Sequence, residues 1–277
     1  ALPISGKSTV AQVVKHFFNT DDVGILSNNA EKKFGLMTLL DKFIWLCLEL
    51  KRSIALDQAE FQSMVSGEPM TAAIKNQTAR PIEWEAPGLL CGNESPNWID
   101  AQGSIARRMA IITFPFSLQN KHVRTDMLHN ILKYELPNLI FKCNVAYRYT
   151  CAINKDKGIW DILPEYFKEE RLRFQQDTDA VFATVYDRQK FELWIESDQT
   201  ENRDDYYVSF SIVESHYQMK WRSLMGNSFA DPFKQEKYGT AFQSAEINET
   251  PSERRVDPKD HIDKEDVWVV GIREKMP

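Results

Sequence analysis

Features that mark several other protein classes are absent from this 277-residue chain. No apolar run approaches the ~20 residues that a helix needs to cross a bilayer, and no secretory signal peptide is visible. The four cysteines are scattered and form no C-x-x-C pair, which favours reduced thiols and argues against a zinc site. The chain also has no internal repeat. We therefore expect neither a membrane partner nor a disulfide framework.

An excess of positive charge is lacking as well, because the formal net charge is −6. This value argues against a protein that coats nucleic acid over its whole surface. It leaves room for a local basic channel, since steering depends on where charge lies. With 43% hydrophobic and 27% charged residues, the composition is that of a globular protein with one large domain or two ordinary ones.

Helix-type and strand-type patterns alternate over the first 125 residues. Helical periodicity is found at 7–18 and 56–65, and short apolar runs of strand type are found at 23–26, 43–50, 88–93 and 109–116. Strands separated by helices predict an α/β fold with a largely parallel sheet.

The remainder of the chain is predicted to be mainly helical, with a polar break at 196–206. Helices are expected at 126–149, 163–187, 208–225 and 234–247, a surface loop at 248–266 and a closing strand at 267–274. Two helices followed by strand-loop-strand suit a winged-helix module. We therefore expect three parts: a core over 1–125, a helical extension over 126–195 and a winged-helix-like module over 196–277.

A short motif near the start of the chain suggests chemistry. Gly6, Lys7, Ser8 and Thr9 spell the second half of a phosphate-binding loop, directly before a helical run. In such a loop the backbone N–H groups cradle the phosphates, the lysine reaches the β- and γ-phosphates, and the serine hydroxyl ligates Mg²⁺. The motif alone is a weak signal, and the full pattern would have a glycine where Ala1 stands.

A working phosphate site needs further groups, and the chain offers them in a consistent order. Glu49 follows an apolar run and would hold Mg²⁺ and polarise the attacking water, and Asn93 ends the next such run and would sense the γ-phosphate. Arg107 and Arg108 precede a third run, and one of them would be an arginine finger supplied to a neighbouring subunit. The motif does not distinguish the two arginines.

Each of these residues also has a plain structural interpretation. Glu49 would be the first solvated residue after a buried strand, and Asn93 would belong to a turn, since Gly-Asn followed by Ser-Pro is good turn chemistry. The paired arginines would form a solvated strand edge. The order lysine, carboxylate, asparagine and arginine favours the functional interpretation.

The segments around these positions resemble superfamily 3 helicases. MVSGEPMTA (64–72) is similar to the L-T-G-G-D-P-I-T-A stretch of that family, and GNESPNWIDAQGSIARRMAIITFPF (92–116) resembles its N-x-x-P, paired arginines and short strand ending in P-F. Two later segments, 163–182 and 267–274, look like the helical extension and winged-helix end of poxvirus-type primase-helicases of nucleocytoplasmic large DNA viruses, which have phage and plasmid relatives.

This resemblance implies a P-loop ATPase core of the AAA+-like type and an ATP-dependent DNA helicase. Such motors form a ring, usually a homo-hexamer, that hydrolyses ATP with Mg²⁺ between subunits and moves 3′ to 5′ on single-stranded or forked DNA. It also implies other replication proteins as partners and a viral replication site in the host cytoplasm. By resemblance, Gly6 to Thr9 fall on the phosphate loop, Glu49 on the metal and water carboxylate, Asn93 on the sensor, and Arg107 or Arg108 on the finger.

The chain departs from the family pattern at two places. The family loop commonly reads G-x-G-x-N-G-K-S-T after a strand, whereas this chain begins ALPISGKST, so we expect it to be a fragment. The family also places a DNA-touching hairpin between Met70 and Glu85. Here Lys75 and Arg80 would contact the DNA backbone, or would simply be solvated.

Two other functions fit parts of the sequence. The first is a nucleotide-binding adaptor that binds DNA without unwinding it, which the incomplete loop favours. The second is a simple P-loop nucleotidase that acts as a monomer.

Overall fold

The computed structural model describes ten segments: residues 5–27, 35–54, 56–72, 80–96, 98, 103–118, 124–194, 202–226, 230–257 and 262–275. The chain divides into two compact units. Unit 1 comprises Ala1–Trp98 and Arg108–Glu170, and unit 2 comprises Ile99–Arg107 and Arg171–Pro277. The secondary structure is mixed α/β, with small sheets.

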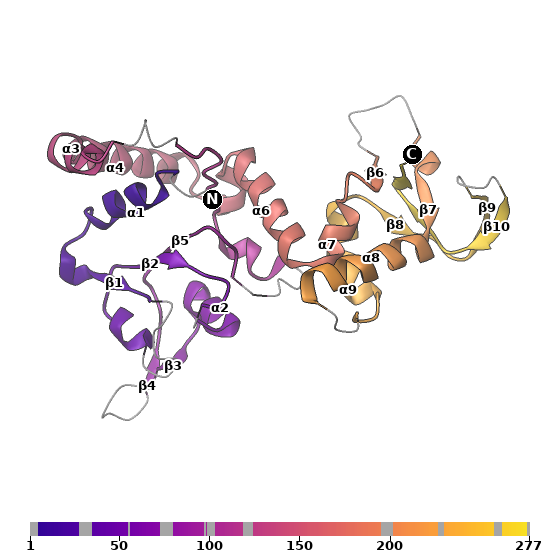
Figure 1. Cartoon of the computed structure of the whole chain (residues 1–277), viewed down its shortest axis with the longest axis horizontal. Coiled ribbons are helices and arrows are strands. Elements are labelled where there is room, and N and C mark those ends of the chain that lie inside the picture. The colour runs from indigo at the N-terminus through magenta and orange to yellow at the C-terminus, as the bar shows by residue number, and fades with distance from the viewer. Residues whose placement is uncertain are drawn as a thin grey trace. The chain divides into compact units, whose positions relative to one another are not determined.

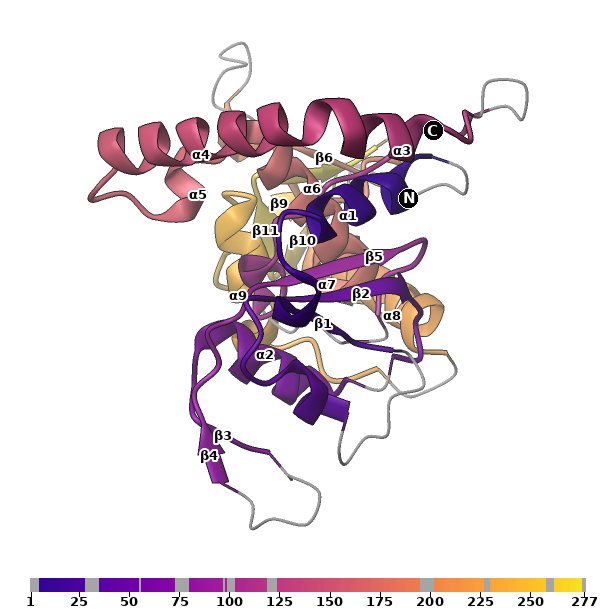
Figure 2. The same cartoon turned by 90° about the vertical axis from the view of Figure 1, so that its left-hand side faces the viewer.

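A three-stranded parallel sheet in the order β1–β2–β5 forms the centre of unit 1 (Figure 1). Its strands are β1 (Val23–Ile25), β2 (Ile44–Leu50) and β5 (Gly88–Gly92). Helices α1 (Lys7–Lys15) and α2 (Gln58–Ser66) lie on opposite sides of this sheet in both views (Figures 1 and 2). These helices and parallel strands confirm the α/β prediction for this region.

The sequence of β2 is one continuous apolar run because its side chains are buried on both faces of the sheet. Ile44 and Leu46 pack with Val23 of β1 into a buried apolar cluster. On β2, Trp45 is 1% exposed, and its ring lies so close to Gly88 that a Cβ there would be 2.1 Å from the indole. Glycine at that position therefore permits β5 to pair with β2.

An antiparallel hairpin follows α2. Strands β3 (Met70–Ala72) and β4 (Arg80–Ile82) pair with Met70 opposite Ile82, which confirms the hairpin expected between Met70 and Glu85. The connection at 73–79 lies outside the described residues, and Lys75 with it.

The strand expected at 109–116 is not formed. A strand needs a neighbouring backbone to satisfy its N–H and C=O groups, and no described residue pairs with this segment in a sheet. The segment contacts α6 (Glu165–Thr178) instead: the Thr113 N–H donates to the Tyr166 hydroxyl at 2.6 Å, and the Thr113 hydroxyl donates to Glu170. This prediction was wrong because an apolar pattern alone does not provide a pairing partner.

A long helical stretch covers 127–153. It consists of α3 (Met127–Asn130), a π-helical turn η6 (Ile131–Glu135) and α4 (Leu136–Ile153). Pro137 has no N–H to donate to the preceding turn, and the wider π turn lets the helix pass it. None of the helices in the described residues is both long and apolar enough to cross a membrane.

Short elements complete both units. Unit 1 also contains the 3-10 helices η1 (Thr20–Asp22) and η2 (Gly35–Leu39) and helix α5 (Ile159–Ile162). The segment Ala106–Arg108 forms the 3-10 helix η4. The prediction of one or two helices at 163–187 is confirmed by α6 and α7 (Ala180–Val185).

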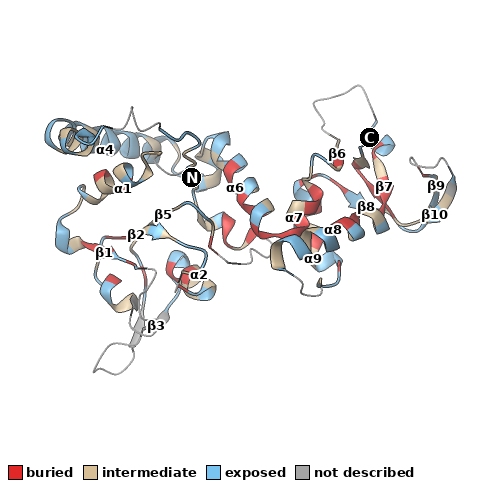
Figure 3. Cartoon of the chain, in the orientation of Figure 1, coloured by how far each residue is buried: buried red, intermediate tan, exposed pale blue. Residues whose placement is uncertain are grey.

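Unit 2 combines helices with a three-stranded antiparallel sheet in the order β7–β11–β8. Its helices after α7 are η7 (Arg203–Asp205), α8 (Phe210–Met225) and α9 (Gln235–Ser244). The sheet strands are β7 (Tyr207–Ser209), β8 (Asn248–Glu249) and β11 (Trp268–Val270), and a second pairing joins β6 (Phe191–Leu193) to β12 (Ile272–Glu274). Buried residues concentrate here (Figure 3), including Trp268 and Val213 at 0% exposure.

The charged tract at 248–266 is not the surface loop that we expected. It contains β8 and an antiparallel hairpin of β9 (Glu253–Val256) and β10 (Asp263–Asp266). The register sets Arg254 opposite Glu265, an exposed pair of opposite charge, whereas Lys264 lies opposite Arg255 and Asp266 opposite Glu253. The paired backbones therefore hold the hairpin, and its charged side chains contribute little. The high density of charged residues led us to expect a loop here.

A partly buried polar cluster connects the turn after α7 with α8. Asp187 accepts from His216 Nε2 at 3.0 Å and from Lys220 Nζ at 2.6 Å. Burial alone would raise the pKa of the Asp187 carboxyl, but the hydrogen bonds from Lys220 and His216 outweigh burial and lower it to about 2. The charged carboxylate therefore stabilises the folded state.

We expect Asp187→Asn to destabilise unit 2 by roughly 2 kcal/mol at neutral pH. The contribution of the carboxylate is present above its unfolded pKa of about 4 and is lost as pH falls towards 2. Urea unfolding of both proteins at pH 7 and at pH 3 measures this, and the difference should shrink at the lower pH. Asp231→Asn, which affects an exposed partner of Lys237, is the control. An equal loss at both pH values would contradict the assignment.

Candidate functional site

The start of α1 has the geometry of an anion site. Gly6 precedes the helix with φ at +88°, and a Cβ there would meet nothing within 4 Å. No side chain caps the helix, and no acidic residue lies in its first turn. The first N–H groups and the positive end of the helix dipole therefore suit a phosphate group.

Lys7 is the first residue of α1, and this helix contacts both β2 and β5. Burial raises the pKa of the Cys91 thiol on β5, and the positive charge of Lys7 acts in the opposite direction. This influence means that the ammonium group lies near the outgoing end of β5. Within the described part of the chain, no carboxylate forms an ion pair with Lys7.

The neighbouring hydroxyl groups differ in their surroundings. Ser8 is exposed and Thr9 is half-buried at the start of α1. The Ser5 hydroxyl is buried and finds no hydrogen-bond partner among the described residues. A phosphate oxygen would satisfy such a group, since a buried hydroxyl without a partner costs about 1–3 kcal/mol.

Glu49 and Asn93 lie at the same edge of the sheet. β2 and β5 are parallel neighbours with Leu50 opposite Gly92, so Glu49 near the end of β2 and Asn93 just after β5 are close in register. Both residues are exposed. Ligands of open parallel sheets bind outside the carboxyl ends of the strands, and these two side chains stand at that edge.

Cys47 lies on β2, two residues before Glu49, and is buried. Burial raises the pKa of its thiol, and a hydrogen bond with the Glu49 backbone offsets part of this rise. The register shifts between Cys47 and Leu50, which indicates a bulge beside Glu49. Bulges re-aim side chains next to functional sites. Sequence reasoning missed Cys47 and Cys91 as neighbours of the site because nothing in a lone cysteine reveals its partner strand.

The two adjacent arginines fall in different units. Arg108 belongs to unit 1, is half-buried, and donates from Nε to the Ser66 hydroxyl at the end of α2, at 2.9 Å. Arg107 belongs to unit 2 and is exposed. This hydrogen bond connects Arg108 with α2 and not with the residues around Lys7.

The structure describes only some of the residues predicted to bind DNA or a metal ion. Lys75 lies outside the described residues, and Arg80 is the first residue of β4. No group of three or more His, Cys, Asp or Glu side chains suited to a metal occurs in the described segments. Mg²⁺ keeps several waters and phosphate oxygens and needs only one or two protein ligands, and the Ser8 hydroxyl and the Glu49 carboxylate are oxygen donors of the type that it uses.

Comparison with known proteins yields a family and a set of similar solved structures. A family of unknown function, DUF5906, matches residues 3–108, less than half of the chain, and this segment contains all the predicted site residues. No curated protein matches. The A-form apo structure of the NrS-1 C-terminal region, CTR(305-718), is similar with a TM-score of 0.38 and 12% identity over 98% of this chain. The chain spans 64% of that solved chain.

Proposed function

We propose that this chain carries the motor of an ATP-dependent DNA helicase that acts in viral DNA replication as a hexameric ring. One observation carries the proposal: the start of α1 and the carboxyl ends of β2 and β5 meet, with Lys7 near Cys91 and with Glu49 and Asn93 at the same sheet edge. In this proposal residues 1–125 form a P-loop ATPase core, with the helical extension and winged-helix-like module after it.

Each residue then has a defined task. The N–H groups after Gly6 and the Lys7 ammonium bind the ATP phosphates, and Ser8 and Glu49 hold Mg²⁺. Glu49 also orients the attacking water, while Asn93 hydrogen-bonds the γ-phosphate. Magnesium, when bound, neutralises charge that develops on the phosphate oxygens.

In the proposed ring the arginine finger comes from a neighbouring subunit. In the proposal Arg107 or Arg108 reaches the nucleotide of an adjacent subunit, so hydrolysis requires assembly. Lys75 and Arg80 on the β3–β4 hairpin contact the backbone of single-stranded DNA, which supplies affinity without sequence preference. Movement from 3′ to 5′, contacts with other replication proteins and a cytoplasmic viral location belong to the same proposal.

Glu49→Gln tests the proposal most directly. We expect ATP hydrolysis stimulated by single-stranded DNA to fall at least ~100-fold, because the amide cannot take up a proton from water, while nucleotide binding persists. Glu94→Gln is the matched control, since Glu94 is an exposed carboxylate beside Asn93 that pairs with Arg52. Hydrolysis is measured by phosphate release and unwinding by strand separation on a forked duplex.

The outcomes separate the competing functions. Hydrolysis without any effect of DNA, in a protein that stays monomeric, would favour a simple nucleotidase. DNA binding that is indifferent to ATP, with no hydrolysis, would favour the adaptor. The winged-helix-like order of α8, α9, β8, the β9–β10 hairpin and β11 supports a DNA-binding or partner-binding module in either case.

A further inference from the structure

The surface of α4 is unusual for a helix in a folded unit. It spans 18 residues, and none of them is buried. All nine residues from 141 to 149 are exposed, on every side of the helix (Figure 3). A helix that is largely apolar all round normally has partners around it.

One face of this helix forms an apolar stripe. Phe141, Val145 and Tyr149 follow one another at spacings of four residues, which places them on the same face of α4, and Tyr134 lies in the π-helical turn before this helix. Their exposures, in this order, are 68%, 51%, 65% and 64%. These four residues are called the α4 stripe.

Positive charge borders the α4 stripe on both sides. Lys142 follows Phe141 and Arg148 precedes Tyr149, so the two cations lie on opposite flanks of the face. The helix from Leu136 to Ile153 contains no acidic residue. Whatever covers the stripe must therefore be apolar in its centre and negative at its rim.

The exposed area indicates a protein partner. Three aromatic side chains of roughly 150–250 Å² each, about two-thirds exposed, present about 400 Å² of surface. Patches of this size on monomers often mark interfaces, and one side of a standard interface buries about 800 Å². The stripe with the stems of its two flanking cations would supply much of such an interface.

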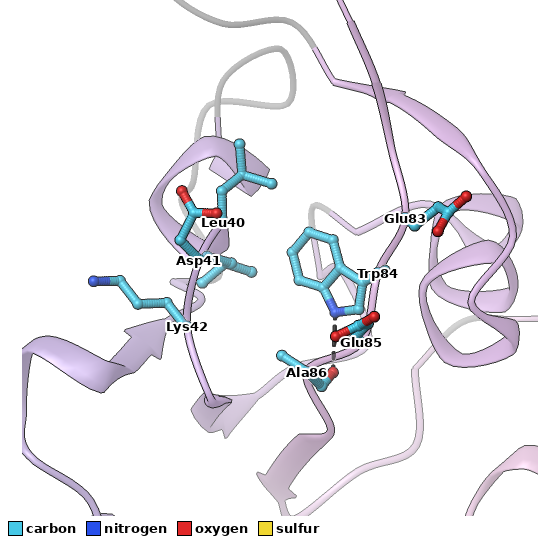
Figure 4. A pocket seen from close by; sticks show the side chains of 8 residues that line it. Leu40, Asp41, Lys42, Glu83, Trp84, Glu85 and Ala86 are labelled. Atoms are coloured by element: carbon cyan, nitrogen blue, oxygen red, sulfur yellow. Dashed lines mark hydrogen bonds between the residues drawn. The ribbon is translucent and has the colours of Figure 1, made fainter.

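Unit 1 also contains a pocket whose charge is opposite to that of the residues flanking the α4 stripe. It lies at the edge of the β1–β2–β5 sheet opposite to the edge with Glu49 and Asn93. The pocket lies where the chain enters β2 and β5, and Trp84 faces the Leu40–Lys42 segment across it (Figure 4). Trp84 is 6% exposed, and its indole N–H donates to the Ala86 carbonyl at 3.0 Å. The pocket is lined by Leu39, Leu40, Asp41, Lys42, Glu83, Trp84, Glu85 and Ala86; it is called the acidic pocket.

Charge and size both match the α4 stripe. Asp41, Glu83 and Glu85 take part in no ion pair within the described part of the chain, and the Lys42 ammonium donates to the Asp21 carbonyl at 2.5 Å. The pocket volume is ≈ 170 Å³. A cavity of about 150 Å³ holds benzene, so this pocket accepts one aromatic ring.

We propose that the α4 stripe of one copy docks in the acidic pocket of a second copy of this chain. The Phe141 ring enters the pocket against Trp84, and Lys142 and Arg148 meet the carboxylates at its rim. Because the two surfaces differ, the contact is head-to-tail and repeats from copy to copy until a ring closes. It deepens the proposed function by naming the subunit contact of the ring, and it requires no nucleotide.

Reciprocal charge reversal tests this docking. The first variant combines Lys142→Glu with Arg148→Glu, and the second combines Glu83→Lys with Glu85→Lys. Each variant alone should associate at least ten-fold more weakly than the wild type in sedimentation velocity without nucleotide. An equimolar mixture should recover association, because every contact between unlike copies is then again between opposite charges.

Matched controls separate docking from net charge and from catalysis. Lys155→Glu with Lys157→Glu makes the same charge change in the turn after α4 and should leave association intact. Phe141→Ala should weaken association of that variant with itself, because its stripe no longer places a ring in the pocket. Lys7→Ala should abolish hydrolysis and still associate, so a failed nucleotide site would leave this inference standing.

Three results would overturn the docking contact. A wild-type protein that stays monomeric up to ~100 μM would remove it, since a standard interface binds more tightly. A mixture of the two charge variants that fails to associate would show that the stripe and the pocket are not partners. Loss of single-stranded DNA binding in the α4 variant, with association unchanged, would assign the stripe to nucleic acid.

Discussion

Lys7→Ala is expected to lower ATP hydrolysis by roughly 10²–10³-fold, the loss seen when one donor to a developing oxyanion is removed. The physical reason is the position of the ammonium group at the start of an uncapped helix, near the outgoing end of β5. No described carboxylate depends on Lys7, so the substitution should leave folding stability almost unchanged. Phosphate release and thermal unfolding, measured on the same samples, separate the two effects.

Lys15→Ala is the control for this substitution. Lys15 is the last residue of α1, where a cation interacts favourably with the helix dipole, and it lies at the end of α1 opposite to Lys7. The Lys15→Ala variant should hydrolyse ATP at the wild-type rate. Wild-type hydrolysis by the Lys7 variant would show that Gly6 to Thr9 do not form a phosphate loop in this protein.

Removing the arginine finger should have the larger effect, a loss of about 10³–10⁵-fold in hydrolysis. Arg107→Ala and Arg108→Ala are made separately because the two residues have different surroundings. Arg108 is half-buried and donates to Ser66, whereas Arg107 is exposed. We expect only one of the two variants to show the full loss.

Mixing experiments then decide whether the finger acts between subunits. In a ring assembled from equal amounts of the Lys7 variant and the arginine variant, about a quarter of the interfaces should be functional. These are the interfaces that join an intact lysine to an intact arginine. Ser66→Ala controls for the structural bond of Arg108 and should retain hydrolysis. Absence of rescue, together with full activity of a monomer, would contradict the ring.

Local patterns in the sequence were sufficient for much of unit 1. The continuous apolar run of β2 follows from burial on both faces of a parallel sheet, and the Pro-containing segment between Met70 and Glu85 forms the expected hairpin. The order of Gly6 to Thr9, Glu49 and Asn93 along the chain already indicated one site. Parallel strands separated by helices bring their carboxyl ends together, so this grouping follows from the order of the elements along the chain.

Nonlocal pairing could not be read in the same way. Residues 109–116 have a good strand pattern but pair with no residue that the structure describes, while 248–266 look like a loop and yet contain the paired strands β9 and β10. The pattern of a segment reports its preference, whereas a strand exists only where a second backbone accepts its hydrogen bonds.

Side-chain neighbours were likewise decided by tertiary structure. The chain order could not reveal that Cys91 lies near Lys7, that Arg108 hydrogen-bonds Ser66, or that Trp84 lines an acidic pocket. Local sequence patterns were sufficient to predict a mixed α/β protein with a Gly-Lys-Ser-Thr motif directly before a helix. Only the tertiary structure decided which groups meet, because contacts between residues far apart in sequence depend on packing geometry and not on local preference.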